Sequence, residues 1–257
     1  MVSSIQQTLE FYAKKYNNKN FIETDPISIP HSFSKRQDIE ISAFWTATIA
    51  WGNRKSIIQN GRRLMQLMDN SPHDFVVHHQ ESDRKNFEKF VHRTFQYTDT
   101  LYFLEFFQNY YIHNNSLEDA FVLTSTGGET PYFEMAFNQF HQRFFNLENV
   151  PARTLKHVSK PSSGSRCKRL VMFLRWMVRK DNKGVDFGLW KNIKMSQLMI
   201  PLDVHVERSA RSLGLLKRSS LDWKAVVELS DNCRRIRPDD PSYYDFALFG
   251  MSIEKLF

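Results

Sequence analysis

Apolar residues recur at helical spacing along most of the chain, and this periodicity constrains the fold more than any other feature. In residues 3 to 16, Ile5, Leu9, Tyr12 and Tyr16 fall on one helix face. The 257 residues include 22 phenylalanines but only 9 glycines, and few stretches alternate as strands do. We therefore predict an all-α fold of about ten or eleven helices.

The same spacing predicts where the other helices lie. Besides 3–16 and the segment 200–215, they cover 37–51, 55–69, 71–80, 84–94, 98–114, 116–124, 130–146, 166–179, 222–235 and 241–255. Small and turn-forming residues predict joints at Gly127–Gly128 and at 161–165.

Cysteine content and hydropathy restrict the class of protein. Cys167 and Cys233 are too few for a disulfide framework or for an iron–sulfur or four-thiolate site. Neither a signal peptide nor a run of about 20 apolar residues is visible. We expect a cytoplasmic protein that has no membrane span and needs neither a metal ion nor another cofactor.

The positive charge is concentrated in one segment. The chain carries a formal charge of +7, yet residues 151–180 hold nine Lys or Arg and no Asp or Glu. Leu170, Phe173 and Trp176 lie among these cations and predict partial burial. The segment is either a solvated basic face or a surface that presents cations to nucleic acid.

Two segments carry residues suited to chemistry. In "SSGSRCKRLVMFL" (162–174), Lys168 stands in the first turns of a helix beside Arg166 and Arg169. Neighbouring cations disfavour an ammonium ion, so Lys168 could be a neutral nucleophile, or it could simply contact phosphate. In "IPLDVHVERSARSLGL" (200–215), Asp203 is an N-cap candidate, and capping alone would explain it.

These segments resemble one enzyme superfamily. "IPLDVHVERSARSLGL" is similar to the Pro-x-Asp-x-His segment of the helix-hairpin-helix DNA glycosylases, which include endonuclease III and the 8-oxoguanine glycosylases. "GSRCKRLVMFL" resembles their hairpin, with Gly164 at the first glycine, Arg166 at the second and Lys168 at the catalytic lysine. "ISAFWTATIAWGNRKSIIQNGRRL" (41–64) resembles their early helix–turn–helix. With "DPSYYDFALFG" (240–250), the likeness suggests a bacterial branch nearest in style to the 8-oxoguanine glycosylases.

The resemblance implies a fold and a reaction. Residues 35–180 would form a helical barrel lobe with a degenerate hairpin, and 1–34 with 181–257 a second helical lobe. The protein would be a base-excision DNA glycosylase and AP lyase acting on a damaged, oxidised purine. Lys168 would form a Schiff base at C1′ and Asp203 would stabilise the cationic sugar. Residues 175–199 lengthen the interval between them and form a lid, a DNA contact or packing.

The resemblance also implies a partner and its contacts. Double-stranded DNA with a lesion would be bound by a monomer associated with the nucleoid. Trp51 and Asn53 would enter the DNA gap, and His205 would orient its helix or touch DNA. The phosphate contacts would come from Arg54, Lys55, Lys160, Arg166 and Arg169. Two alternatives stay open, namely a non-catalytic DNA-binding protein of the same fold and an RNA-processing role for the same cleft.

Overall fold

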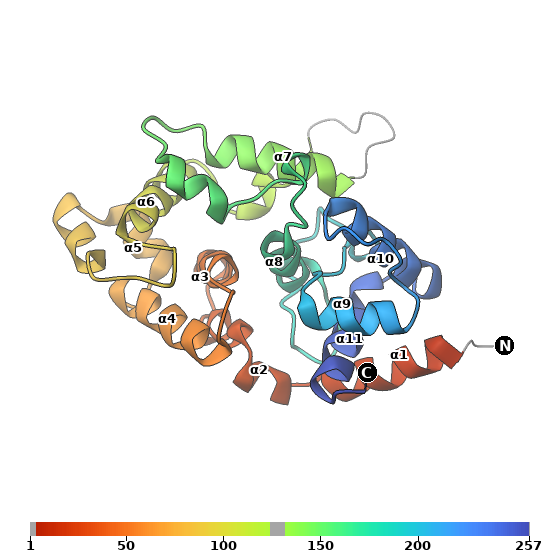
Figure 1. The fold of residues 1–257 in the computed structure, drawn as a ribbon. Helices are drawn as coiled ribbons and strands as arrows, with labels where there is room; N and C mark the ends of the chain where they lie inside the picture. Colours follow the sequence, from red (N-terminus) through yellow and green to blue (C-terminus); the bar gives the residue numbers. More distant parts are fainter. Residues whose placement is uncertain (1–3, 124–131, 257) are drawn as a thin grey trace. The chain divides into compact units, whose positions relative to one another are not determined.

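The computed structural model describes residues 4–123 and 132–256, and this part of the chain is helical throughout (Figure 1). Its only β-type pairing is an isolated antiparallel bridge between His92 and Phe95, and the described residues contain no strand. The predicted all-α class is therefore confirmed.

Eleven α-helices are described, and single 3-10 segments join several of them. The α-helices are α1 (Ser4–Tyr16), α2 (Asn20–Thr24), α3 (Arg36–Thr48), α4 (Arg54–Leu67), α5 (Pro72–His78), α6 (Tyr97–Tyr111), α7 (Tyr132–Phe144), α8 (Lys168–Val178), α9 (Val204–Ser212), α10 (Trp223–Ile236) and α11 (Tyr244–Ile253). The 3-10 segments are η1 (Pro26–Ser28), η2 (Pro30–Ser32), η3 (Glu81–Phe87), η4 (Leu117–Ala120), η5 (Ala152–His157), η6 (Pro161–Ser163), η7 (Met195–Gln197) and η8 (Pro241–Tyr243).

Two predicted helices are wrong. The segment 84–94 forms the end of η3 and then a turn, because Arg93 adopts the left-handed region (φ 55°) next to the His92–Phe95 bridge. The aromatic side chains of this segment are buried, but they project from η3 and the following turn and not from one face of an α-helix. The described part of 116–124 holds only the short η4. The predicted joint at Gly127–Gly128 lies outside the described residues.

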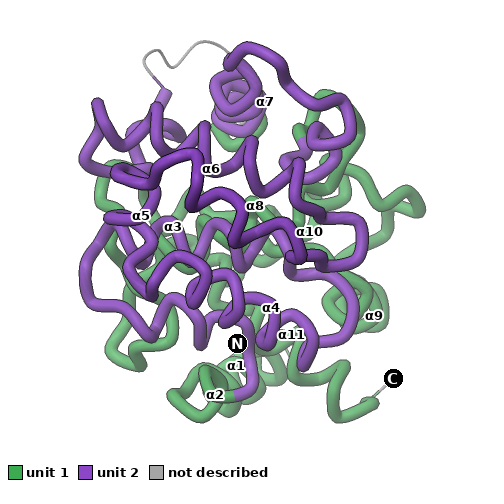
Figure 2. Tube along the Cα trace, turned by 90° about the vertical axis from the view of Figure 1, so that its left-hand side faces the viewer, with its two compact units in different colours: residues 1–23, 130–134, 160–257 green, residues 24–129, 135–159 purple. Residues whose placement is uncertain are grey.

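The chain divides into two compact units (Figure 2). Unit 1 comprises residues 1–23, 130–134 and 160–257, and unit 2 comprises 24–129 and 135–159. The lobes expected from the resemblance have their boundaries at 34/35 and 180/181. The boundaries between the units fall at 23/24 and 159/160, and residues 130–134 also belong to unit 1. As a result α8 belongs with α9, α10 and α11 in unit 1.

The core of unit 2 is built from phenylalanine rings. Phe44 of α3 lies 6.0 Å from Phe103 and 5.5 Å from Phe107 of α6, measured between ring centroids. It also lies 5.6 Å from Phe140 and 5.8 Å from Phe144 of α7. All five side chains are buried, and these separations are those that attractive aromatic pairs adopt. We call these five residues the phenylalanine cluster.

The core of unit 1 is built around α11. This helix packs against α1 and against α9, and most of its residues are buried. Gly250 lies directly under the Tyr16 ring of α1, where a Cβ would collide with the ring carbons. The absence of a side chain at Gly250 therefore permits the close approach of α1 to α11.

Candidate active site

Lys168 is the first residue of α8, behind a turn with two left-handed residues. The turn runs from η6 through Gly164 (φ 75°) to Cys167 (φ 47°), the residue before the helix. Glycine adopts this region without strain, whereas a buried cysteine rarely does. Lys168 itself is half-buried. The structure thus fixes the lysine at a helix N-terminus, where the helix dipole favours an anion.

Asp203 caps α9, as predicted. Its Oδ1 accepts hydrogen bonds from the backbone N–H of His205 (2.9 Å) and of Val206 (3.0 Å), and the side chain is half-buried. Both donors and the helix N-terminus interact favourably with a carboxylate.

His205 joins α9 to α11. Its Nδ1 lies 3.1 Å from the Ser252 hydroxyl, and its ring lies 5.7 Å from that of Phe249. These contacts attach the start of α9 to α11.

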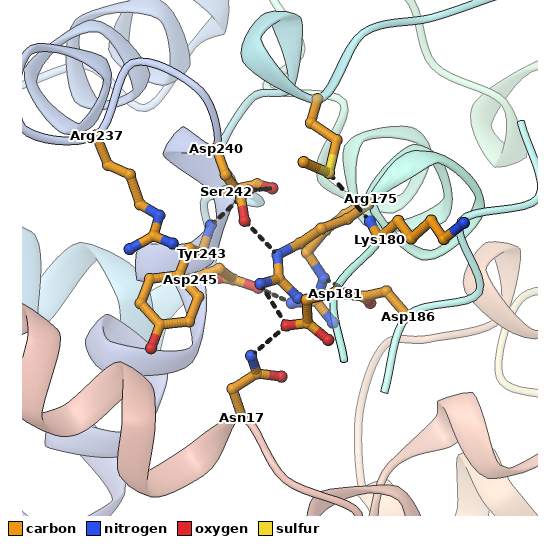
Figure 3. A network of polar contacts seen from close by, with 12 residues as sticks. Asn17, Arg175, Lys180, Asp181, Asp186, Arg237, Asp240, Ser242, Tyr243 and Asp245 are labelled. Atoms are coloured by element: carbon orange, nitrogen blue, oxygen red, sulfur yellow. Dashed lines mark hydrogen bonds and ion pairs between the residues drawn. The ribbon is translucent and has the colours of Figure 1, made fainter. Parts of the chain in front are cut away.

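A third charged group of unit 1 is Asp245. Asp245 lies on α11, is buried, and forms an ion pair with Arg175 of α8 (Figure 3). Its pKa is raised to about 6, because burial and the nearby Asp203 raise it more than Arg175 and Lys168 lower it. Lys168 and Asp203 are thus both among the charged groups that influence the ionisation of this buried carboxyl. We call Lys168, Asp203 and Asp245 the lysine–aspartate site.

Sequence reasoning did not single out Asp245. The stretch "DPSYYDFALFG", which contains it, was noted only for its resemblance. The sequence feature that could have indicated Asp245 is an aspartate within an otherwise apolar helix, because a carboxylate buried in this way needs a charged or hydrogen-bonding partner.

Asp245 belongs to a larger set of buried charges, the arginine–aspartate network (Figure 3). Arg175 Nε lies 3.3 Å from Asp186. Arg179, which is 1% exposed, reaches Asp181 (2.8 Å), Asp186 (3.1 Å) and Asp240 (2.9 Å). The network comprises Arg175, Arg179, Asp181, Asp186, Asp240 and Asp245.

The network shows that not every cation of residues 151–180 is available to a nucleic-acid partner. Arg175 lies on the buried face of α8 and Arg179 is the buried C-cap residue that follows the helix, and acids from later in the chain neutralise both. Residues 185–190 pack beside them, because Phe187 N–H and Trp190 N–H bond to the carbonyls of Trp176 and Met177. Two of the nine cations are therefore structural.

The other predicted phosphate contacts in unit 1 flank the start of α8. Lys160, Arg166 and Arg169 are half-buried. Burial lowers the pKa of Arg169 to about 10, which leaves its guanidinium charged at neutral pH. Arg166 Nη1 is buried and makes no hydrogen bond to the described residues.

The remaining predicted DNA contacts lie in unit 2. Trp51 is half-buried, with its ring 5.7 Å from His157 at 30° and 5.2 Å from His92, edge-on. Asn53 caps α4 by accepting the Ser56 N–H at 3.2 Å. Arg54 is half-buried and Lys55 is exposed. Two histidines therefore brace Trp51, and Asn53 has a structural role at its helix start.

Unit 2 holds its own buried charge beside Trp51. His157 Nε2 lies 3.4 Å from the Asp99 carboxylate, which also accepts from the Thr154 hydroxyl at 2.8 Å. Burial opposes the charge of Asp99, but the contact with His157 and the hydrogen bonds from Gln96 N–H and the Thr154 hydroxyl outweigh it and lower its pKa to about 2.

Residues 25–254 match a family described as Protein of unknown function (DUF2400). The chain belongs to the DUF2400 family. The match includes Lys168, Asp203 and Asp245 as well as Trp51 and Asn53. Neither the curated proteins nor the solved structures give a significant match.

Over the described residues, no three or more His, Cys, Asp or Glu side chains are grouped so that they could hold a metal ion. None of the described helices is long and apolar enough to cross a membrane.

Proposed function

We propose that this protein is a base-excision DNA glycosylase and AP lyase that removes an oxidised purine through a Schiff base on Lys168. One observation carries the proposal. Lys168 begins α8 and Asp203 caps α9, and both helices contact α11, α8 through the Arg175–Asp245 ion pair and α9 through the His205–Ser252 contact. Residues far apart in the sequence would thus supply a nucleophile and a fixed carboxylate from helices of unit 1 that share one neighbour.

The proposed reaction uses each group once. The lone pair of neutral Lys168 Nζ forms a bond to C1′ while the bond from C1′ to the base nitrogen breaks. Its electron pair leaves with the base, which takes up a proton. The lysine nitrogen then loses a proton as the sugar ring opens, and O4′ gains one, which gives a protonated Schiff base. Loss of a C2′ proton expels the 3′ phosphate and cleaves the strand.

Asp203 has an electrostatic role in this scheme. Positive charge develops on the sugar as the glycosidic bond weakens, and a carboxylate held by two N–H donors stabilises that charge without reorganising. The lesion would be flipped out of the duplex, because C1′ cannot be attacked within the stack.

The proposed partner is double-stranded DNA, bound by a monomer that is associated with the nucleoid. Lys160, Arg166 and Arg169 would neutralise phosphates beside the start of α8, and Arg54 and Lys55 beside Trp51, so affinity should fall as salt rises. The two-lobed helix-hairpin-helix architecture is part of the same proposal.

Borohydride trapping tests the function. The full chain is incubated with duplexes that carry 8-oxoguanine, uracil or an abasic site, and the mixture is then reduced. We expect a covalent complex with the 8-oxoguanine duplex that disappears in Lys168→Gln and persists in Lys191→Gln, which changes an exposed lysine of the same unit. Absence of a trapped complex on every duplex would refute the lyase step.

A second candidate is a DNA-binding protein of the same fold without turnover. The turn before α8 favours it, because Arg166 stands where the resembled hairpin has its second glycine and Cys167 is left-handed. Salt-dependent binding to lesion DNA without trapping would identify this case.

A further inference from the structure

We propose that Asp245 is a positioning residue of the lysine–aspartate site, whose carboxylate, held by Arg175, accepts the proton that the Lys168 ammonium must lose. This inference rests on the proposed function. It adds the group that prepares the nucleophile and assigns Asp203 and Asp245 different roles.

Lys168 lies on the same face of α8 as Arg175, the partner of Asp245. Lys168 and Arg175 are seven residues apart on α8, which puts them on the same helix face two turns apart. Arg175 fixes Asp245 at the start of α11 through a buried ion pair. The face of α8 that carries Lys168 is therefore the face that meets Asp245.

The third helix brings Asp203 to the same region. α9 packs against α11, and the His205–Ser252 contact ties the start of α9 to that helix. Since Asp203 caps α9 two residues before His205, its carboxylate is carried toward α11 as well.

The environment of Asp245 suits a proton acceptor. The charged and titratable groups around it are Lys168 and Arg175 on α8, Asp186 in the following loop, Asp203 at α9 and Cys233 on α10. Burial is the largest influence, and with these neighbours it brings the pKa of Asp245 from 3.8 to about 6. A carboxylate with this value is a stronger base than an ordinary aspartate and closer to the pH at which general bases work best.

The step balances as a proton transfer. The Lys168 ammonium gives one proton to an Asp245 oxygen, which leaves a neutral amine and a neutral carboxylic acid. Asp203 keeps its negative charge for the sugar cation. The proton returns to solvent when the product leaves and Asp245 ionises again.

The first test compares Asp245→Asn with Asp240→Asn, which removes a buried aspartate of the same network that pairs with Arg179 instead. Competitive acetylation across pH, read for the Lys168 peptide by mass spectrometry, gives the midpoint at which the amine becomes reactive. Loss of the nearby negative charge should lower this midpoint by about one pH unit in Asp245→Asn only. An unchanged midpoint would overturn the proposal.

The rate of trapping distinguishes proton transfer from a purely electrostatic effect, because the two predict opposite changes in the rate for Asp245→Asn. At neutral pH we expect Asp245→Asn to form the borohydride-trapped complex about 100-fold more slowly than the wild type, although its lysine is more often neutral. Faster trapping would show that Asp245 acts only as a counter-charge and would overturn the proposal.

A third test changes Lys168 and follows the titration of Asp245, so it does not depend on whether Asp245→Asn folds. In Lys168→Met, carboxyl-carbon NMR should show Asp245 titrating at a higher pH than in the wild type, because the lysine charge lowers its pKa. An unmoved titration would overturn the proposal. If both variants show the expected pKa shifts but the wild type traps no lesion, the proposed function and the proton-transfer role are both refuted. Only the electrostatic coupling between Lys168 and Asp245 then stands.

Discussion

The phenylalanine cluster of unit 2 and the arginine–aspartate network of unit 1 are both buried, but different forces hold them. In the cluster, each ring gains from the area removed from water and from edge-on contacts with its neighbours. In the network, two guanidinium groups satisfy four carboxylates, and desolvation makes each partner depend on the others. Unit 1 thereby maintains charge in its interior next to the lysine–aspartate site, which a purely apolar core could not do.

The largest expected effect comes from removing one arginine of the network. Arg179→Met leaves the carboxylates of Asp181, Asp186 and Asp240 without this partner, so we expect a loss of about 3–5 kcal/mol of unfolding free energy. Urea unfolding measures the loss, and hydrogen exchange should locate it in α8 and α11. Arg211→Met is the control, since its i,i+4 pair with Glu207 is more exposed and should cost less than about 1 kcal/mol.

A matched substitution in the phenylalanine cluster of unit 2 should lower the unfolding free energy by nearly as much, but this loss should not depend on salt. Phe44→Ala opens a cavity among four rings, and we expect a loss of about 3–4 kcal/mol. Urea unfolding at low and high salt should give the same difference from wild type, because no charge is involved. Phe11→Ala, at a side chain 63% exposed, should change stability little. A salt-dependent loss for Phe44→Ala would contradict the comparison.

Acid should affect the two units in opposite directions. The folded-state pKa of Asp245 is about 6, above its usual 3.8, so unit 1 should gain stability as the pH falls from about 6 toward 4. In unit 2, burial lowers the pKa of His92, so stability should fall once the pH drops below about 6.5. The pKa of Asp99 is lowered to about 2, so a further loss should follow between about pH 4 and pH 2.

Hydrogen exchange, corrected for intrinsic rates, can follow α11 and α6 separately across this range. Asp245→Asn should abolish the gain in unit 1, and His92→Gln should reduce the first loss in unit 2. Parallel behaviour of both units would show that these buried groups do not govern the pH response.

The smallest expected difference concerns two helix caps. Asn53→Ala removes the side-chain acceptor at the start of α4 and should cost about 1 kcal/mol. Asp203→Asn keeps a capping oxygen at α9, so thermal unfolding should change by only a few tenths of a kcal/mol. Under the proposed function, trapping should nonetheless fall sharply. A variant with full activity would leave Asp203 with a capping role alone.

Local features were predicted well because they depend on neighbouring residues. The helical class, most helix positions and the Asp203 cap follow from apolar spacing and from a side chain that can reach the next amides. The helix predicted over 84–94 failed because periodicity registers buried aromatics but not the left-handed backbone at Arg93. Nothing local marks that residue as unusual.

By itself, then, the sequence determined an all-helical chain, the Asp203 cap and the two residue types of the proposed lysine–aspartate pair. Only the tertiary structure decided what these residues face. Periodicity shows that Arg175 and Arg179 share a helix face, but not that Asp186, Asp240 and Asp245 lie opposite them. The partners come from distant segments, and a charge is tolerated inside a core only where such partners converge. For the same reason, Asp245 could be recognised as a neighbour of Lys168 only after α8, α9 and α11 had packed together.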